Sequence, residues 1–293
     1  MGKARQAGCL SSAPACAPGS VLVADPIVVM KRYELKYLLD DWQTAFLTEK
    51  LRGRMALDQY GRTSIASLYY DTPDCRLIRT SLEKPAFKEK IRLRSYGLAN
   101  EESPVYLELK RKAGGIVYKR RVKSTIPQVE KFFAGTGDIC AEGSGTAEGS
   151  GTAGGSGTAG GSGTAGSQIN REITYFRDYY GALSPACLII YDREAYFEPG
   201  GGRLPGGDRP PGGDLRLTID YNPRYRVDHL NLTDSMEGLP LRPPGHTILE
   251  IKVQDAMPLW LARILDEGRI YKSSFSKYGE AFRRQIINTR NAG

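Results

Sequence analysis

The stretch Lys90-Ile91-Arg92-Leu93-Arg94 decides the fold, because cationic and aliphatic residues alternate in it without a break. Successive side chains of a β-strand point to opposite faces. The three cations would therefore share one face, and the two aliphatic residues would share the other. On a single strand, such a charged face is usually only the solvated face of a sheet.

The same alternation recurs in other strand-like segments. The charged residues that would share a face within their segment are Arg32, Glu34 and Lys36; Glu108 and Lys110; Lys119 and Arg121; Arg193; Arg216; and Glu250 and Lys252. A solvated face normally mixes both signs with neutral polar residues, whereas nearly every strand here offers Arg or Lys. A ring of like charge repels itself unless a polyanion or a metal ion neutralises it. A closed barrel would point these residues inward and create a basic tunnel.

Strand-like segments dominate the chain. We expect strands at 27–39, 65–70, 87–96, 105–111, 115–124, 188–197, 215–227 and 247–253, and helices after residue 40, at 257–266 and at 276–288. Asp40 is a plausible N-cap for the first helix, because Gln43 follows three residues later. Strands and helices do not alternate regularly, which argues against a parallel α/β sheet. The sequence predicts an α+β, mainly β fold, built as an antiparallel barrel or sandwich.

The domain boundaries are indicated by composition. A six-residue unit of Ala, Glu or Gly, Gly, Ser, Gly and Thr repeats four times from residue 141. Segments of this kind form flexible coils and cannot join a core. We therefore expect one domain at 30–288, interrupted by a flexible insertion at 141–167, with a disordered tail at 1–29 and a short tail at 289–293. The Gly- and Pro-rich segment 199–213 would be a long hairpin loop.

Composition narrows the classes of partner and site. The 293 residues include 41 Lys and Arg against 33 Asp and Glu, so the net charge of +8 favours a polyanionic partner. Five scattered cysteines without a CxxC pair argue against disulfides or zinc and favour a reducing, cytoplasmic location. The two histidines leave little material for histidine-based metal sites or Ser-His-Asp catalysis. No apolar run is long enough to span a membrane, so no transmembrane segment is expected.

The residue types on these strands suit phosphoryl transfer. Arg binds phosphate oxygens bidentately and Lys acts as a point charge. Positioning and charge neutralisation supply most of the rate in this chemistry. Mg²⁺ or Mn²⁺ would need oxygen ligands, and the available candidates are Glu250, Glu108 and Glu34. A nucleic-acid partner is not expected, because the cations lie on strands without a motif of exposed aromatics or a basic helix.

An ordered set of short motifs resembles the VTC (vacuolar transporter chaperone) domain, the polyphosphate polymerase branch of the CYTH-like triphosphate tunnel metalloenzymes. The motifs, in family order between residue 30 and about residue 287, are Arg32-Tyr-Glu-Leu-Lys36-Tyr37, Ser67-Leu-Tyr-Tyr-Asp71-Thr72, Lys90-Ile-Arg92-Leu-Arg94, Leu107-Glu108-Leu-Lys110, Lys119-Arg-Arg121, Tyr191-Asp-Arg193, Leu215-Arg216-Leu-Thr-Ile-Asp220, Leu249-Glu250-Ile-Lys252 and Ser276-Lys277-Tyr278. Each motif is weak alone, but the ordered set is specific.

The resemblance implies an eight-stranded antiparallel tunnel with flanking helices. Its implied reaction moves the γ-phosphate of ATP onto a growing polyphosphate chain and releases ADP. The catalytic residues would be Arg92, Arg94, Lys110, Arg193 and Arg216. The residues that bind the nucleotide or the phosphate chain would be Arg32, Lys36, Lys90, Lys119, Arg121, Lys252, Ser276 and Lys277. The resemblance assigns Glu250 as the ligand of Mn²⁺ or Mg²⁺.

One departure concerns the first strand. The wider superfamily opens with Glu-x-Glu-x-Lys, but Arg32 occupies the first Glu position here. This change removes one potential metal carboxylate and favours the polymerase branch. Two alternatives remain open: a tunnel hydrolase of inorganic or organic triphosphates, and a non-catalytic polyphosphate-binding module.

Overall fold

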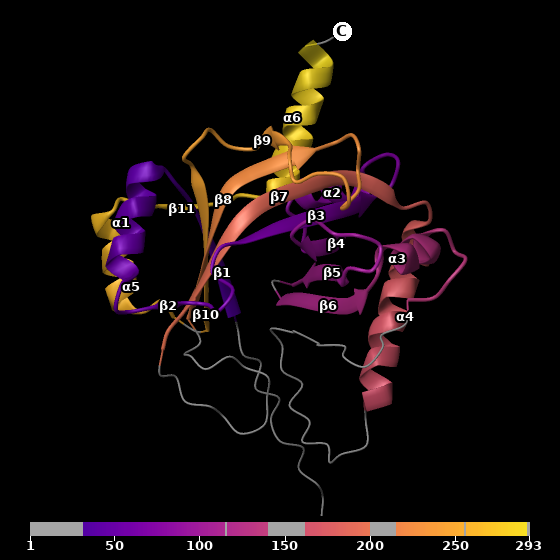
Figure 1. The fold of residues 1–293 in the computed structure, drawn as a ribbon, viewed down its shortest axis with the longest axis horizontal. Helices are drawn as coiled ribbons and strands as arrows, with labels where there is room; N and C mark the ends of the chain where they lie inside the picture. Colours follow the sequence, from indigo (N-terminus) through magenta and orange to yellow (C-terminus); the bar gives the residue numbers. More distant parts are fainter. Residues whose placement is uncertain (1–31, 115, 140–161, 200–214, 255, 292–293) are drawn as a thin grey trace, which may run out of the picture.

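In a computed structural model of the chain, the strands form one antiparallel, strongly curved sheet (Figure 1). The structure describes residues 32–114, 116–139, 162–199, 215–254 and 256–291, without the side chains of 32, 162–167, 254 and 286–291. The strand order is β11-β1-β10-β8-β7-β3-β4-β5-β6, with β2 beside β7 and β9 beside β8. The strands are β1 (Arg32–Leu39), β2 (Ala56–Leu57), β3 (Thr63–Asp71), β4 (Phe87–Tyr96), β5 (Val105–Ala113), β6 (Ile116–Ser124), β7 (Ser184–Phe197), β8 (Arg216–Arg226), β9 (Leu239–Pro240), β10 (Thr247–Gln254) and β11 (Lys272–Ser273).

The closed eight-stranded barrel is not confirmed. The eight expected strands are present as the long strands, but β2, β9 and β11 bring the sheet to 11 strands. Within the described residues, the sheet does not close by pairing its two ends. It nevertheless curves strongly, because Lys110 on β5 lies 3.4 Å from the Glu34 carboxylate on β1, several strands away in the sheet order. We call the concave face of this sheet the lumen.

Six helices flank the sheet: α1 (Asp41–Leu51), α2 (Arg76–Leu82), α3 (Ile126–Phe133), α4 (Ser162–Tyr180), α5 (Leu259–Glu267) and α6 (Lys277–Asn291). The expected capping box is confirmed, since the Gln43 amide nitrogen donates to the Asp40 carboxylate at 2.7 Å and the Gln43 side chain accepts from the Asp40 amide at 3.2 Å. Helix α4 begins at residue 162, so the last part of the insertion expected to be flexible is helical. The expected tail 1–29, residues 141–161 of the insertion and most of the 199–213 loop lie outside the described residues.

Helices α1, α3, α4 and α5 cover the outer face of the sheet, where many of the aliphatic residues lie. Ile91 and Leu93 are 0% and 2% exposed and belong to a core that also contains Phe132 of α3 and Ile173 of α4. A second core lies beneath α1 and α5 and includes Leu249 of β10. The alternation on β4 is therefore confirmed, because Ile91 and Leu93 pack against helices while Arg92 and Arg94 lie on the opposite, concave face. The concave face also carries apolar residues: a third core joins Ile65 of β3 and Ile189 of β7 to α2 and α6. No helix in the described part of the chain has the length and apolar character needed to cross a membrane.

Candidate functional site

The first group of lumen charges surrounds Glu108 on β5. This carboxylate is 2% exposed, and four cations from β4 and β6 lie around it. They are Arg92 at 2.8 Å, Arg94 at 3.6 Å, Lys119 at 3.3 Å and Arg121 at 3.5 Å. Burial alone would raise the pKa of Glu108, but the four cations hold it well below its usual range. One negative charge is thus shared among four positive charges, which leaves the group cationic.

The second group lies on β1, β7, β8, β10 and the start of α6. Arg193 binds the fully buried Asp220 carboxylate with two hydrogen bonds of 2.5 and 2.8 Å. Lys277 also binds Asp220 and lies 3.6 Å from Glu250. Burial would raise the pKa of Glu250, but Lys36, Lys277 and Arg193 hold it well below its usual range. This group therefore contains two carboxylates that stay charged in a buried place.

The chemistry of the Glu34 and Glu250 donor set fits a hard divalent cation. The Lys36 ammonium lies 3.3 Å from Glu34 and 3.0 Å from Glu250, so both carboxylates reach one shared cation. Although burial opposes ionisation, the ammonium of Lys110 contributes to lowering the pKa of Glu34 to about 2. No described group of three or more His, Cys, Asp or Glu side chains is arranged to hold a metal ion. Mg²⁺, however, commonly uses one or two carboxylates together with substrate phosphates.

The expected metal ligand Glu108 has different surroundings. A metal ion at Glu108 would face the positive charges of four neighbouring side chains. Its position therefore suits a counter-ion better than a metal ligand. Glu34 and Glu250 differ from Glu108 in that both carboxylates contact one shared ammonium, that of Lys36, although Glu250 also contacts Arg193 and Lys277.

A row of like charge crosses three strands. Lys90 on β4 lies directly opposite Lys110 on β5, which lies directly opposite Lys119 on β6. Like charges that face each other across strands are destabilising. Burial, together with the ammonium of Lys110 and other cations, lowers the pKa of Lys90 to about 7. The Lys90 ammonium donates a hydrogen bond of 3.2 Å to the Ser276 hydroxyl, just before α6. The folded chain thus keeps an arrangement that a bound polyanion would stabilise.

The remaining expected residues lie at the edge of the second group or outside it. Lys252 on β10 lies between Glu34 on β1 and Arg216 on β8 in the sheet register. Burial lowers the pKa of Lys252 to about 8, although Glu250 and Glu34 oppose the shift. Arg32 lies on β1, but its side chain is outside the part that the structure describes. All other expected site residues have contacts or register positions on the lumen.

Two lumen tyrosines were missed in the residue assignment from sequence. The Tyr69 hydroxyl accepts a hydrogen bond of 2.9 Å from Arg92, and its ring stacks on Tyr278 with centroids 4.7 Å apart. Tyr191 lies beneath Lys277, whose nitrogen is 4.6 Å from the ring centroid. The period-two pattern could have indicated both tyrosines, because Tyr69 and Tyr191 lie on the same face of their strands as the lumen residues. The Tyr69 hydroxyl thus contacts Arg92, and the Tyr191 ring contacts Arg193 and Lys277.

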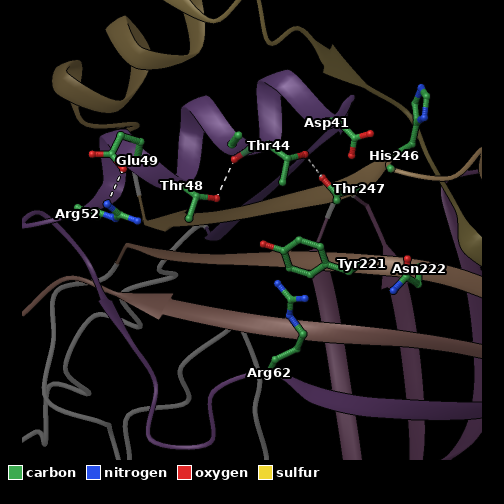
Figure 2. A pocket seen from close by; sticks show the side chains of 12 residues that line it. Asp41, Thr44, Thr48, Glu49, Arg52, Arg62, Tyr221, Asn222, His246 and Thr247 are labelled. Carbon is green, nitrogen blue, oxygen red and sulfur yellow. Dashed lines mark hydrogen bonds and ion pairs between the residues drawn. The ribbon is translucent and has the colours of Figure 1, made fainter.

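A separate pocket of about 550 Å³ lies on the outer face, between α1 and strands β8 and β10 (Figure 2). Its polar groups largely satisfy one another: Arg52 pairs with Glu49 at 2.8 Å, and the Thr44 and Thr247 hydroxyls lie 2.8 Å apart. None of the expected site residues lines this pocket. The expected phosphate-binding residues lie on the lumen instead, although Arg52 and Arg62 also line this pocket.

Comparison with known proteins gives one extensive sequence match. The VTC domain family profile matches residues 31–285, whereas no curated protein sequence matches the chain. Among solved structures, a putative adenylate cyclase from Vibrio parahaemolyticus is 12% identical, with a TM-score of 0.38, covering 85% of this chain and 97% of the other. A putative adenylyl cyclase from Hippeastrum, described as having a dominant triphosphatase activity, is 17% identical, with a TM-score of 0.41, covering 84% and 92%. These structural similarities are too distant to assign an activity or a residue role to this chain.

Proposed function

Because this chain belongs to the VTC domain family, we propose that it is a polyphosphate polymerase that transfers the γ-phosphate of ATP to a growing polyphosphate chain and releases ADP. The observation that supports this most is the excess of cations in the lumen. Among the described residues, eleven cationic side chains accompany four carboxylates there: Lys36, Lys90, Arg92, Arg94, Lys110, Lys119, Arg121, Arg193, Arg216, Lys252 and Lys277 with Glu34, Glu108, Asp220 and Glu250. A phosphate chain carries the compensating negative charge in a regular array.

The proposed step requires little covalent participation by the protein. A terminal phosphate oxygen of the chain attacks the γ-phosphorus of ATP, and the bond from that phosphorus to the β–γ bridging oxygen breaks. Arg92 and Arg193 would bind non-bridging oxygens, and the contacts of both guanidinium groups with tyrosine and carboxylate side chains support this role. Lysine side chains of the lumen would neutralise the negative charge on the two reacting phosphate groups during transfer. A divalent cation bound by Glu34, Glu250 and phosphate oxygens would add to this neutralisation.

The test is ATP turnover in the presence of Mn²⁺ or Mg²⁺, with chain length and phosphate products measured separately. Polymerase activity gives long polyphosphate and ADP. Orthophosphate without chains would instead indicate hydrolysis, and tight polyphosphate binding without turnover would indicate a binding module.

Paired arginine variants test the assignment of the lumen. Arg92→Ala should abolish turnover while the fold is retained, because it removes a phosphate-binding group from the lumen. Arg52→Ala is the matched control, since Arg52 directly follows α1 and forms an exposed ion pair with Glu49, away from the lumen. Full activity of Arg92→Ala would contradict the site assignment.

A further inference from the structure

The cationic face of β4 continues beyond the residues assigned to the site. Lys88 lies two residues before Lys90 and therefore points to the same face of the strand. It lies directly opposite Lys112 on β5. Like charges therefore face each other in this pair, as they do in the pair of Lys90 and Lys110. The pair of Lys88 and Lys112 lies two residues nearer the hairpin that joins β5 to β6.

A third lysine joins this pair. Lys84, between α2 and β4, is exposed, as is Lys112, while Lys88 is half-buried. Burial, followed by the charges of Lys112, Lys84 and Lys110, lowers the pKa of Lys88. The Lys88 ammonium donates to the backbone carbonyl of Ser81 at 3.3 Å. We call Lys84, Lys88 and Lys112 the lysine rim.

The length of this cationic face exceeds what a triphosphate needs. From Lys88 to Arg94, the face covers three two-residue steps, or about 20 Å at the usual rise of a strand. A triphosphate has only two bridging oxygens, so it cannot contact every cation along the face at once. A polymer with the same repeating charge can contact all of them.

We propose that the lysine rim is an additional polyphosphate-binding subsite, which holds the part of the chain that extends beyond the lumen. This inference rests on the proposed function for the identity of the polymer. The rim would keep the product attached between successive transfers and would therefore lengthen the chains made in each binding event. Its charges are exposed enough to bind a flexible chain without a closed pocket, because phosphate contacts of this kind act by counter-ion release.

The test compares binding of tripolyphosphate with binding of long-chain polyphosphate by isothermal titration calorimetry. The variant is the double substitution Lys88→Gln and Lys112→Gln. Lys84 is retained because its backbone has a φ of 57°, in the left-handed region. The matched control is Lys50→Gln with Lys131→Gln, which removes the same charge from α1 and α3, outside the lumen and the rim.

The double variant should bind the long chain about tenfold more weakly, while its affinity for tripolyphosphate stays within about twofold of the wild type. The plot of log binding constant against log salt concentration for the long chain should also become shallower, by about 0.7 in slope for each lost phosphate contact. Thermal unfolding checks that the variant folds. The single Lys112→Gln variant, changed at an exposed position, should show about half of the loss in binding free energy.

Three outcomes would overturn the subsite: an unchanged preference for long chains, an equal loss for both ligands, or the same loss in the control variant. Equal competition by a single-stranded oligonucleotide of matched charge would assign the surface to nucleic acid instead. The binding measurement does not depend on turnover. If the wild type makes no chains from ATP but shows the length-dependent binding, the proposed function fails and the subsite stands.

Discussion

Glu108→Gln should destabilise the unliganded protein strongly, although it changes neither size nor shape. The wild-type carboxylate is 2% exposed and shares its charge among Arg92, Arg94, Lys119 and Arg121. Removing one partner of a buried ion pair typically costs about 3–5 kcal/mol, because the remaining charges stay buried without compensation. Since single domains are stable by only about 5–15 kcal/mol, this loss is a large share of the total.

The assay is equilibrium urea unfolding near pH 7, with and without tripolyphosphate. The variant should gain more stability from the ligand than the wild type does, because phosphate replaces the missing negative charge among the four cations. Glu102→Gln is the control, since Glu102 is exposed in a loop, and such surface changes usually alter stability by less than about 0.5 kcal/mol.

The same prediction has a definite pH dependence. The folded-state pKa of Glu108 is depressed, so its contribution is fully present above the unfolded pKa of about 4.3 and is lost as the pH falls further. The difference between wild type and variant should therefore shrink in acid. Unchanged stability at pH 7, or lost Mn²⁺ binding without lost stability, would refute the counter-ion role and support a metal ligand at this position.

Three further predictions concern single groups. Because the pKa of Lys90 is about 7, polyphosphate binding at pH 8 should take up a proton, detected by calorimetry in buffers of different ionisation enthalpy; persistence of the full uptake in Lys90→Gln would contradict this. The buried Thr218 hydroxyl has no hydrogen-bond partner among the described residues, so Thr218→Val should raise the free energy of unfolding by about 1 kcal/mol; a loss measured in urea would reveal a partner. Tyr278 donates to the buried Asp71 carboxylate at 2.9 Å, so Tyr278→Phe should lower stability by about 1–2 kcal/mol; an unchanged thermal midpoint would show that this bond contributes nothing.

The face on which each strand residue lies could be predicted from sequence because burial imposes a period of two. Ile91 and Leu93 must pack beneath helices, which places Arg92 on the opposite face whatever the global topology. The first helix could be located because its capping box involves only Asp40 and Gln43, three residues apart. Such short-range patterns are complete within the sequence itself.

Other elements depended on contacts that no local pattern contains. Helix α2 is only seven residues long, and the Asp71 side chain accepts from the amides of Leu77 and Ile78 at its start. Helix α3 is an exception, because the capping box from Thr125 to Gln128 is a local pattern that could have predicted its start. Helix α4 begins among small residues typical of a coil, yet its later part packs Ile169, Ile173 and Phe176 into the core. Tertiary burial overrides local propensity there.

Two further features could be found only in the structure: how far the sheet curves, and which charged side chains pair. The contact of Lys110 with Glu34 joins residues 76 positions apart, and it depends on the curvature accumulated over many strands. Arg193 and Asp220, by contrast, are direct cross-strand neighbours on β7 and β8, so their contact depends on the register of that one pair. A sequence can indicate that cations face one lumen, but not which carboxylate each cation contacts.

These contacts bear on how the lumen could release its product. The start of α6 connects the lysine row on β4, β5 and β6 with the second group of charges, because Ser276 accepts from Lys90 while the adjacent Lys277 contacts Asp220 and Glu250. A phosphate chain must compete with these carboxylates for the same cations, so each new phosphate contact replaces an existing one. The net affinity is then much smaller than the number of cations would imply. If the proposed polymerase reaction holds, internal counter-ions would let the lumen bind the polyanion and still let it advance by one phosphate after each transfer.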